Sequence, residues 1–237
     1  MDALVVDGLT RRFGTTEALR GLSFRVAEGE LYGLIGPDAA GKTTTIRALS
    51  GLILPDTGTI QVLGKAPGDP TVRERVGLMP QHYSLYGDLS VIENLRFFGQ
   101  LFGLDKKRWA ARTERLLHIT RLAPFTERRA DALSGGMYKK LALSCALLHE
   151  PPVLLLDEPT NGVDPVSRRE LWALLHEFVT GGMTVLVSTP YMDEAEKCNR
   201  VGLMHHGRLI DEGDPNELSR GFPSFEELFI ARTREVA

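Results

Sequence analysis

The residues with the clearest chemical potential form a short loop at positions 36–43, Gly-Pro-Asp-Ala-Ala-Gly-Lys-Thr. Two glycines separated by four residues and followed by lysine and threonine are the pattern of a phosphate-binding loop (P-loop). In such a loop, backbone N–H groups and the N-terminus of the next helix face an anion. Lys42 can then reach the β- and γ-phosphates of a nucleotide, and the Thr43 hydroxyl can ligate Mg²⁺. The predicted nucleotide-binding residues are Gly36, Pro37, Asp38, Ala39, Ala40, Gly41, Lys42, Thr43 and Thr44.

A second cluster is Asp157-Glu158, which follows the apolar run 153–156. Four consecutive apolar residues predict a strand that is buried on both faces of a parallel sheet. Ligands of open α/β sheets bind beyond the carboxyl ends of such strands. Asp157 suits Mg²⁺, directly or through water, and Glu158 suits a general base that orients an attacking water. The alternative is a capped strand end without a catalytic role.

Two further stretches have a weaker chemical signal when each is taken alone. Ser134-Gly135-Gly136 precedes a helical stretch at 137–148, so it would present free N–H groups at a helix N-terminus. Phe13 could stack on adenine, because a purine face packs on an aromatic ring. The alternatives are an N-cap with a glycine turn for the first stretch, and a core or edge phenylalanine for the second.

The elements that must position these residues alternate between strands and helices. The apolar run 31–35 predicts the strand that enters the P-loop, and 44–49 predicts the helix that leaves it. Residues 90–121 have a helical period and predict an inserted helical block whose arginines and lysines face solvent. Other predicted strands are 4–6, 22–26, 59–63, 76–79 and 183–188, with a hairpin at 201–210 and helices at 165–179, 191–197, 214–218 and 222–230. This alternation predicts an α/β fold with a mostly parallel sheet.

Composition narrows the remaining classes. The 237 residues are 43% hydrophobic and 25% charged, which is ordinary for a globular domain. The net charge of −3 gives no basic field, so nucleic acid is not an expected partner. No apolar run is long enough to predict a membrane span, and the N-terminus lacks the pattern of a secretion signal. Cys145 and Cys198 are expected to be reduced thiols rather than a disulfide.

The order of these motifs resembles the ATP-binding subunit of ATP-binding cassette (ABC) transporters, over essentially the whole chain. A signature at the head of a helix, upstream of the acidic motif, distinguishes this family from other P-loop proteins. In chain order, the matching residues are the aromatic Phe13, Walker A at 36–43, Gln81 of the Q-loop, the signature at 133–136, Walker B ending at Asp157-Glu158, and the D-loop ending at Asp164.

The resemblance implies a single ABC ATPase domain over residues 1–237 with the α/β fold of a P-loop NTPase. It implies a RecA-like core at about 1–85 and 150–222, with a mostly parallel sheet and an antiparallel β subdomain. A helical subdomain that carries the signature would be inserted at about 86–149, and a short C-terminal helix would follow at about 223–233.

The resemblance also implies how the residues act, with ATP as the nucleotide. Glu158 and Gln81 would be catalytic, and Thr43, Gln81 and Asp157 would serve Mg²⁺. Two such domains would dock head-to-tail around two ATP molecules. Each ATP would lie between one chain's Walker A loop and the other chain's signature, so the nucleotide-binding residues would include Phe13, Ser134, Gly135, Gly136 and Asp164. The helical subdomain and the segment after Gln81 would carry motion to membrane subunits.

Two tracts, 85–90 and 191–196, are similar to the ATPases of ABC-2 type exporters, which handle drugs, lipids or polysaccharides. This implies an ATPase on the cytoplasmic face of the inner membrane that drives transport through separate membrane subunits. One alternative is a soluble ABC regulator or translation factor without a membrane partner, although such proteins usually carry two cassettes. Another is a nucleotide-binding structural subunit without useful turnover, against which Glu158 argues.

Three positions depart from the family pattern. Pro190 replaces the switch histidine that contacts the γ-phosphate, and proline offers neither a side-chain donor nor an N–H. Asp38, followed by Ala39, replaces the usual asparagine and glycine and puts a carboxylate near the phosphates, whereas Met137 replaces the usual glutamine with little expected effect. The pattern resembles the half of tandem efflux ATPases that lacks the switch histidine. A slow site on this chain is therefore expected, and a heterodimer with a second ABC ATPase is favoured over a homodimer.

Overall fold

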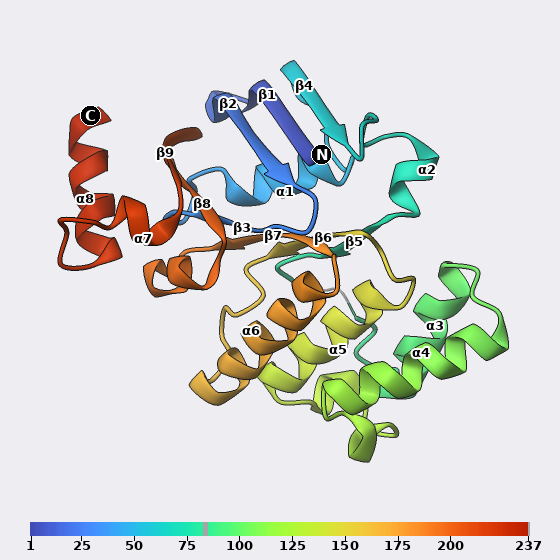
Figure 1. Ribbon diagram of the computed structural model, residues 1–237. Helices are drawn as coiled ribbons and strands as arrows, with labels where there is room; N and C mark the ends of the chain where they lie inside the picture. The colour runs from blue at the N-terminus through green and yellow to red at the C-terminus, as the bar shows by residue number, and fades with distance from the viewer. Residues whose placement is uncertain (83–84, 237) are drawn as a thin grey trace.

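The structure, a computed structural model, describes residues 1–82 and 85–236. Within these residues the central sheet has six strands in the order β5-β6-β7-β3-β8-β9 (Figure 1). The strands are β3 Leu31–Ile35, β5 Val76–Met79, β6 Val153–Asp157, β7 Thr184–Thr189, β8 Arg200–His205 and β9 Arg208–Gly213. Neighbouring strands are parallel except β8 and β9, which form an antiparallel hairpin. The predicted mostly parallel sheet and the predicted hairpin are confirmed.

The central strands are buried on both faces, which explains their unbroken apolar sequences. In β6, Leu154 and Leu156 belong to the hydrophobic cluster on one face. Val153 and Leu155 belong to the cluster on the opposite face. Side chains alternate in this way along any strand, and each buried leucine contributes about 1.5–3 kcal/mol relative to exposure. Burial therefore fixes the register of the strand that ends at Asp157.

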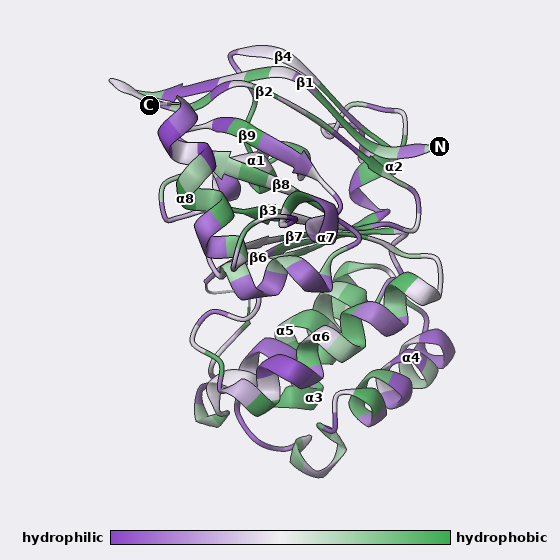
Figure 2. Cartoon of the chain, turned by 60° about the vertical axis from the view of Figure 1, so that its left-hand side comes forward, coloured by the Kyte–Doolittle hydropathy of each residue, from purple (hydrophilic) through white to green (hydrophobic). Residues whose placement is uncertain are grey.

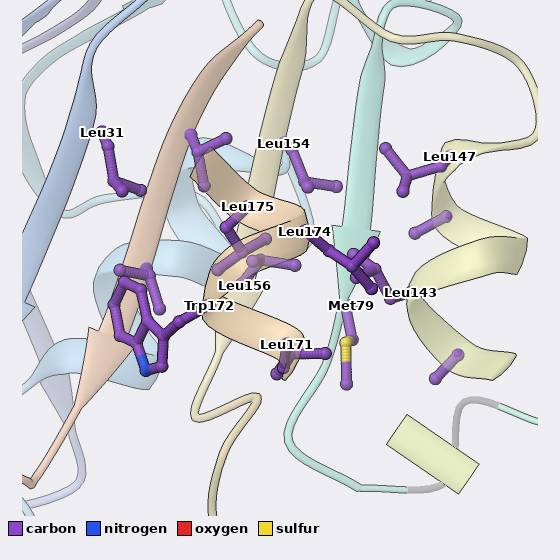
Figure 3. Close-up of a cluster of buried hydrophobic side chains, with 14 of the residues drawn as sticks. Leu31, Met79, Leu143, Leu147, Leu154, Leu156, Leu171, Trp172, Leu174 and Leu175 are labelled. Carbon is purple, nitrogen blue, oxygen red and sulfur yellow. The ribbon is translucent and has the colours of Figure 1, made fainter. Parts of the chain in front are cut away.

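Helices cover both faces of this sheet. α1 (Lys42–Leu49) lies between the central sheet and the N-terminal sheet, whereas α5 (Gly135–Leu147) and α6 (Pro165–Thr180) cover the opposite face (Figure 1). Figure 3 shows one buried cluster to which α5, α6 and the strands contribute, among others, Leu143, Leu147, Leu154, Leu156, Trp172 and Leu175. This packing holds the N-termini of α5 and α6 in fixed positions relative to the strand ends.

The N-terminal sheet is antiparallel, with the order β2-β1-β4. Its strands are β1 Asp2–Phe13, β2 Thr16–Ala27 and β4 Thr57–Val62. The strand predicted at 4–6 covers only the first part of β1, and the strand predicted at 22–26 covers only the second part of β2. The parts of both strands next to the turn that joins them were missed, because they include polar residues such as Arg11 and Arg12 and because their pairing has register shifts.

The helical block predicted at 90–121 contains α3 (Val91–Leu101) and α4 (Lys106–Ile119). Ser90 begins α3 with a capping box that includes Glu93. α4 buries Leu116 and Leu117. Its exposed residues include Lys106, Lys107, Arg108 and Arg115, and Figure 2 shows the hydrophilic stripes that result. The expectation that this basic surface faces solvent is confirmed.

The other helices include α2 Pro70–Arg73, η1 Ala123–Phe125, η2 Ala130–Ala132, η3 Met192–Lys197, α7 Pro215–Leu218 and α8 Phe225–Val236. The helix predicted at 191–197 is the 3₁₀ helix η3, and the predicted C-terminal helix starts and ends later than expected. Phe225 and Leu228 of α8 are buried, so this helix packs on the body. Across residues 1–82 and 85–236, no helix has the length and apolarity to cross a membrane. Cys145 and Cys198 are free and buried.

Candidate active site

Three strand ends bring the predicted residues to one edge of the central sheet. β3 leads into the P-loop, β6 ends at Asp157, and β7 ends at Thr189. The Gly36 N–H donates to the carbonyl oxygen of Thr189 at 3.3 Å, so the P-loop starts beside the end of β7. This edge is the carboxyl end of the parallel strands, where ligands of α/β sheets bind.

The curl of the P-loop requires Gly41. Its φ of +107° lies in a region that residues with a side chain rarely adopt. A Cβ at this position would also lie 2.7 Å from the carbonyl oxygen of Ala18. The loop leads directly into α1, whose first two residues are Lys42 and Thr43. The positive end of the helix dipole therefore faces the same space as these two side chains.

Lys42 is buried, with 3% of its surface exposed, and its ammonium group is compensated by neighbours. Lys42 Nζ donates to the carbonyl oxygens of Gly36 and Pro37 at 2.8 and 3.0 Å. It also lies 3.4 Å from Oε1 of Glu158. Taking an ammonium ion out of water costs several kcal/mol, so these partners are necessary for its burial. The predicted phosphate-binding lysine and the predicted general base are therefore neighbours.

The carboxylate of Asp157 accepts hydrogen bonds from two hydroxyls. Thr43 Oγ1 donates to Asp157 Oδ1 at 3.1 Å, and Ser188 Oγ donates to the same oxygen at 2.7 Å. Burial raises the pKa of Asp157, and these two hydrogen bonds oppose that rise. A bound cation would relieve the cost of burying this carboxylate. A hydroxyl and a carboxylate are hard oxygen ligands of the kind that Mg²⁺ takes together with phosphates, so the donor set fits Mg²⁺.

Glu158 has a strained backbone and a fully engaged side chain. Its φ is +49°, which is unusual for a residue other than glycine and must be offset by its surroundings. Its N–H donates to the Ser188 carbonyl oxygen at 3.1 Å and to Ser188 Oγ at 3.0 Å. Gln81 Nε2 and Asn161 Nδ2 donate to Glu158 Oε2 at 2.6 and 3.1 Å. The structure thus brings Gln81, Glu158 and Lys42 together.

A cavity of about 350 Å³ opens over these groups. Its lining consists of Thr16, Glu17, Ala18, Asp38, Ala39, Ala40, Gly41, Lys42, Thr43, Thr44, Gln81 and Glu158.

Phe13 is 47% exposed at the end of β1, and the Arg11 guanidinium lies 4.8 Å from the centre of its ring. The core alternative for Phe13 is therefore wrong.

The signature residues lie outside this cavity, at the start of α5. Ser134 is exposed and caps the helix, because its Oγ accepts a hydrogen bond from the Met137 N–H at 3.3 Å. Gly135 is also exposed, whereas Gly136 packs against α6. A Cβ on Gly136 would lie 2.4 Å from Ser167 Oγ. A single chain therefore does not bring its signature and its P-loop together.

Asp164 also lies outside the cavity and caps α6. One carboxylate oxygen of Asp164 accepts hydrogen bonds from the N–H groups of Val166 and Ser167, each at 3.0 Å. Hydrogen bonds from Ser167 hold the pKa of Asp164 below its usual value. The predicted nucleotide-binding role of Asp164 thus does not involve this chain's own cavity.

Pro190 follows the end of β7, where a fully buried carboxylate, Glu194, gathers the surrounding polar groups. Its oxygens contact Thr160 Oγ1 at 3.0 Å, Thr189 Oγ1 at 2.6 Å, Trp172 Nε1 at 2.9 Å and Arg168 Nε at 2.8 Å. These contacts join the end of β7 to α6 and to the loop after Glu158. Pro190 therefore begins a segment whose position is well defined.

The structure adds site residues that the sequence did not indicate. Ser188 bonds to both acidic residues of Walker B, and its place near the end of an apolar strand could have indicated it. Lys139 Nζ, from α5, donates to the carbonyl oxygens of Gln81 and Glu158 at 3.1 and 3.4 Å. Burial lowers the pKa of Lys139. In the sequence, nothing distinguishes Lys139 from its neighbour Lys140.

Residues 19–161 match the family described as ABC transporter. The chain belongs to this family. It is 46% identical over 224 residues to the probable multidrug ABC transporter ATP-binding protein YbhF of Escherichia coli (strain K12), covering 92% of this chain and 39% of that protein. The ABC chain thus spans well under half of YbhF. It is 42% identical over 218 residues to the Nod factor export ATP-binding protein I of Ralstonia nicotianae, covering 91% and 68%. It is 43% identical over 219 residues to the daunorubicin resistance ATP-binding protein DrrA3 of Streptomyces coeruleorubidus, covering 91% and 69%.

The fold of this ABC chain agrees with solved structures. The ATP-binding subunit of an ABC transporter superposes with a TM-score of 0.87 at 31% identity, covering 98% of this chain and 99% of the other. The predicted P-loop NTPase fold is therefore confirmed. ABC cassettes bind and hydrolyse ATP, so the chain is an ATPase. Its relatives support an ATP-binding transporter subunit over a soluble regulatory ATPase.

Proposed function

We propose that this cassette drives an ABC-2 type exporter through separate membrane subunits. Relatives named for multidrug transport, Nod factor export and daunorubicin resistance support an export role. The tracts 85–90 and 191–196 support the same subfamily. A cassette that acts on membrane subunits would be bound peripherally on the cytoplasmic face of the inner membrane.

The observation that carries the ATP-hydrolysing part of the proposal is the cluster of Lys42, Gln81 and Glu158 at the carboxyl end of the sheet. Lys42 and the N–H groups of the P-loop would bind the β- and γ-phosphates of ATP. Glu158 would take a proton from the attacking water while the water oxygen bonds to the γ-phosphorus. The bond from that phosphorus to the bridging oxygen breaks, which releases ADP and phosphate. Gln81 would hold Glu158 in the required orientation.

The remaining parts of this site would hold Mg²⁺ and the adenine ring. Thr43 and Asp157, whose oxygens lie 3.1 Å apart, would bind the ion together with Gln81. When bound, Mg²⁺ supplies neutralisation of the phosphate charge. The Arg11 guanidinium lies over one face of the exposed Phe13 ring. Phe13 would therefore stack on adenine with the other face of the ring.

A second cassette would complete the site. Ser134 and Gly135 are exposed at the N-terminus of α5, which suits a γ-phosphate held on the Walker A loop of another chain. Asp164 fixes the neighbouring N-terminus of α6 and would lie at the same interface. The solved structure of one similar cassette, MJ0796, is a dimer bound to ADP and phosphate, with a TM-score of 0.80 and 24% identity.

The site on this chain's own P-loop would hydrolyse ATP slowly. Pro190 provides no donor where a switch histidine would act, and losing one preorganised donor costs on the order of 10²–10³ in rate. Asp38 lines the same cavity as Lys42 and Thr43. A carboxylate about 6 Å from a phosphate charge opposes it by about 0.7–3 kcal/mol. The favoured partner is therefore a different ATPase that carries the switch histidine and whose own ATP site would be completed by the signature of this chain.

ATP turnover by the purified chain tests the proposal, with Pro190→His and Glu158→Gln as variants. The wild type is expected to be slow, Pro190→His to raise kcat by about 10²-fold, and Glu158→Gln to remove turnover in both backgrounds. If the wild type equals Pro190→His, the slow-site proposal fails. If Glu158→Gln leaves turnover unchanged, Glu158 is not the base.

A further inference from the structure

Lys139 contacts the backbone of both predicted catalytic residues. Its ammonium nitrogen donates to the carbonyl oxygen of Gln81 at 3.1 Å and to that of Glu158 at 3.4 Å. The side chains of these two residues hydrogen-bond to each other at 2.6 Å. Lys139 therefore connects two chain segments, one after β5 and one after β6, at the place where their side chains meet.

The hydrogen bond to the Glu158 carbonyl stabilises an unusual backbone conformation. Because the φ of Glu158 is +49°, the backbone stays in this conformation only where its neighbours fix it. Ser188 holds the N–H from β7, and the N–H of Asn161 donates to the Glu158 carbonyl from within the same loop at 3.2 Å. Lys139 provides the contact from the helical side of the molecule.

The position of Lys139 on α5 gives this contact a further consequence. α5 begins with the signature glycines, and Lys139 lies only three residues after Gly136. At 1.5 Å per residue, the rise along the helix between them is about 4.5 Å. A rigid helix thus joins the proposed contact with another chain's ATP to the carbonyls of this chain's catalytic residues.

We infer that Lys139 is a positioning residue that fastens the signature helix to the catalytic carboxylate of the same chain. The inference rests on the proposed role of Glu158 as the general base. Lys139 acts through the Gln81 and Glu158 carbonyls, so it sets the orientation of the carboxylate rather than the affinity for ATP. Movement of α5 on partner binding would then move Glu158 in this chain's own site.

The adjacent Lys140 provides a matched comparison on the same helix. Lys140 is more buried than Lys139 and forms an ion pair with Glu170 of α6. It has no contact with Gln81 or Glu158 among those described. Removing its charge should therefore loosen the packing of α5 on α6 without releasing the two catalytic carbonyls.

The test is steady-state ATP turnover of the full chain in the wild type, Lys139→Met, Lys139→Arg, Lys140→Met, Glu158→Gln and Lys139→Met/Glu158→Gln. The turnover that Glu158→Gln abolishes is the activity of this chain's own site. Lys139→Met should lower kcat by about tenfold with KM for ATP changed less than about twofold, because a small misplacement of a catalytic group mainly slows the chemical step. Lys139→Arg should recover most of that loss, and Lys140→Met should keep kcat while lowering Tm.

The double variant separates positioning from a general loss of structure. Because Glu158→Gln removes turnover, this pair of variants is compared by its affinity for a fluorescent ATP analogue. If Lys139 only orients the carboxylate of Glu158, Lys139→Met/Glu158→Gln should bind the analogue within about twofold of Glu158→Gln. Equal effects of Lys139→Met and Lys140→Met on kcat, or a clear loss of ATP affinity when Lys139→Met is added to Glu158→Gln, would overturn the inference. An unchanged rate in Glu158→Gln would instead refute the proposed function itself, and this outcome is distinguishable from the other two.

Discussion

Two regions of the molecule differ in how their polar residues are partnered. The cradle consists of the P-loop with Lys42, Asp157 and Glu158, and the signature surface consists of Ser134, Gly135 and Asp164. In the cradle, Lys42 and Glu158 are each 3% exposed and contact one another. At the signature surface, Ser134 and Asp164 are exposed and use their side chains to cap their own helices. The groups of the cradle contact one another within the chain, whereas the signature surface presents helix N-termini outward. One chain therefore supplies two halves of different sites.

Two aspartates, Asp157 and Asp164, lie in these two regions, and their pKa values are shifted in opposite directions. Burial raises the pKa of Asp157 in the cradle. Hydrogen bonds from Ser167 lower the pKa of Asp164 at the signature surface. The first carboxylate is destabilised until a cation or proton arrives, whereas the second is most stable as an anion. Burial of Asp157 therefore favours binding of a cation in the cradle, whereas the hydrogen bonds that Asp164 accepts fix the N-terminus of α6 at the signature surface.

Removing the lysine of the cradle should have the largest effect on binding. Among the described residues that line the cavity, Lys42 is the only one with an ammonium group, so Lys42→Met deletes that donor. A charged hydrogen bond contributes up to about 3 kcal/mol. The affinity for ATP should therefore fall by about 100-fold. Titration of the full chain with a fluorescent ATP analogue measures this loss.

Ser134→Ala is the matched control for the signature surface. At protein concentrations that keep the chain monomeric, this variant should bind the same analogue within about twofold of the wild type, because Ser134 lies outside the cavity. The proposed division between cradle and signature surface fails if Ser134→Ala weakens binding as much as Lys42→Met.

An intermediate effect is expected on stability at the signature. Gly136→Ala forces a Cβ to within 2.4 Å of Ser167 Oγ, so α5 and α6 must shift apart. Overpacking of this kind costs about 1–3 kcal/mol, or roughly 5 °C in Tm for a chain of this size. Gly135→Ala meets only the Gly162 carbonyl oxygen at 3.1 Å and should change Tm less. Thermal unfolding followed by circular dichroism compares the two, and equal shifts would remove the packing role of Gly136.

The smallest effects should appear in the pH dependence of Tm, measured without nucleotide. The raised pKa of Asp157 means that its favourable contribution is complete below its ordinary value of 3.8 and is lost as pH rises through the folded-state pKa. Asp157→Asn removes this loss, so its Tm relative to the wild type should rise with pH above about 4.

Asp164→Asn should show the opposite slope. The lowered pKa means that Asp164 contributes stability above 3.8 and loses it as pH falls through the folded-state pKa. The Tm deficit of Asp164→Asn should therefore shrink at acidic pH. If the Tm of both variants relative to the wild type changes with pH in the same direction, burial and capping do not determine the pKa values of Asp157 and Asp164.

The fold was largely predictable because its core strands are buried on both faces. Such strands appear as continuous apolar runs, so β3, β5 and β6 were located closely from the sequence. The strands β1 and β2 of the N-terminal sheet were predicted too short, because cross-strand pairing rather than a continuous apolar sequence defines the parts next to the turn that joins them. The type of η3 was missed, since the order of Met192–Lys197 depends on contacts to Glu194 from distant segments.

The active site was predictable where one short stretch supplies several groups. The P-loop and Asp157-Glu158 each lie on contiguous positions, and the structure brings them together with Gln81. Lys139 was not predictable, because its contacts depend on how the helical block packs on the core. A charged residue on a helix has the same sequence appearance whether it faces solvent or a buried carbonyl.

The buried carboxylate of Glu194 has a genetic consequence. Four groups from three segments converge on it, so one substitution leaves several donors without a partner. Removing one member of such a buried network costs about 3–5 kcal/mol, which is much of the stability of an ordinary domain. Alleles that change Glu194 should therefore be temperature-sensitive, active at low growth temperature and lost at high temperature. Alleles that change Lys42 should be inactive at every temperature.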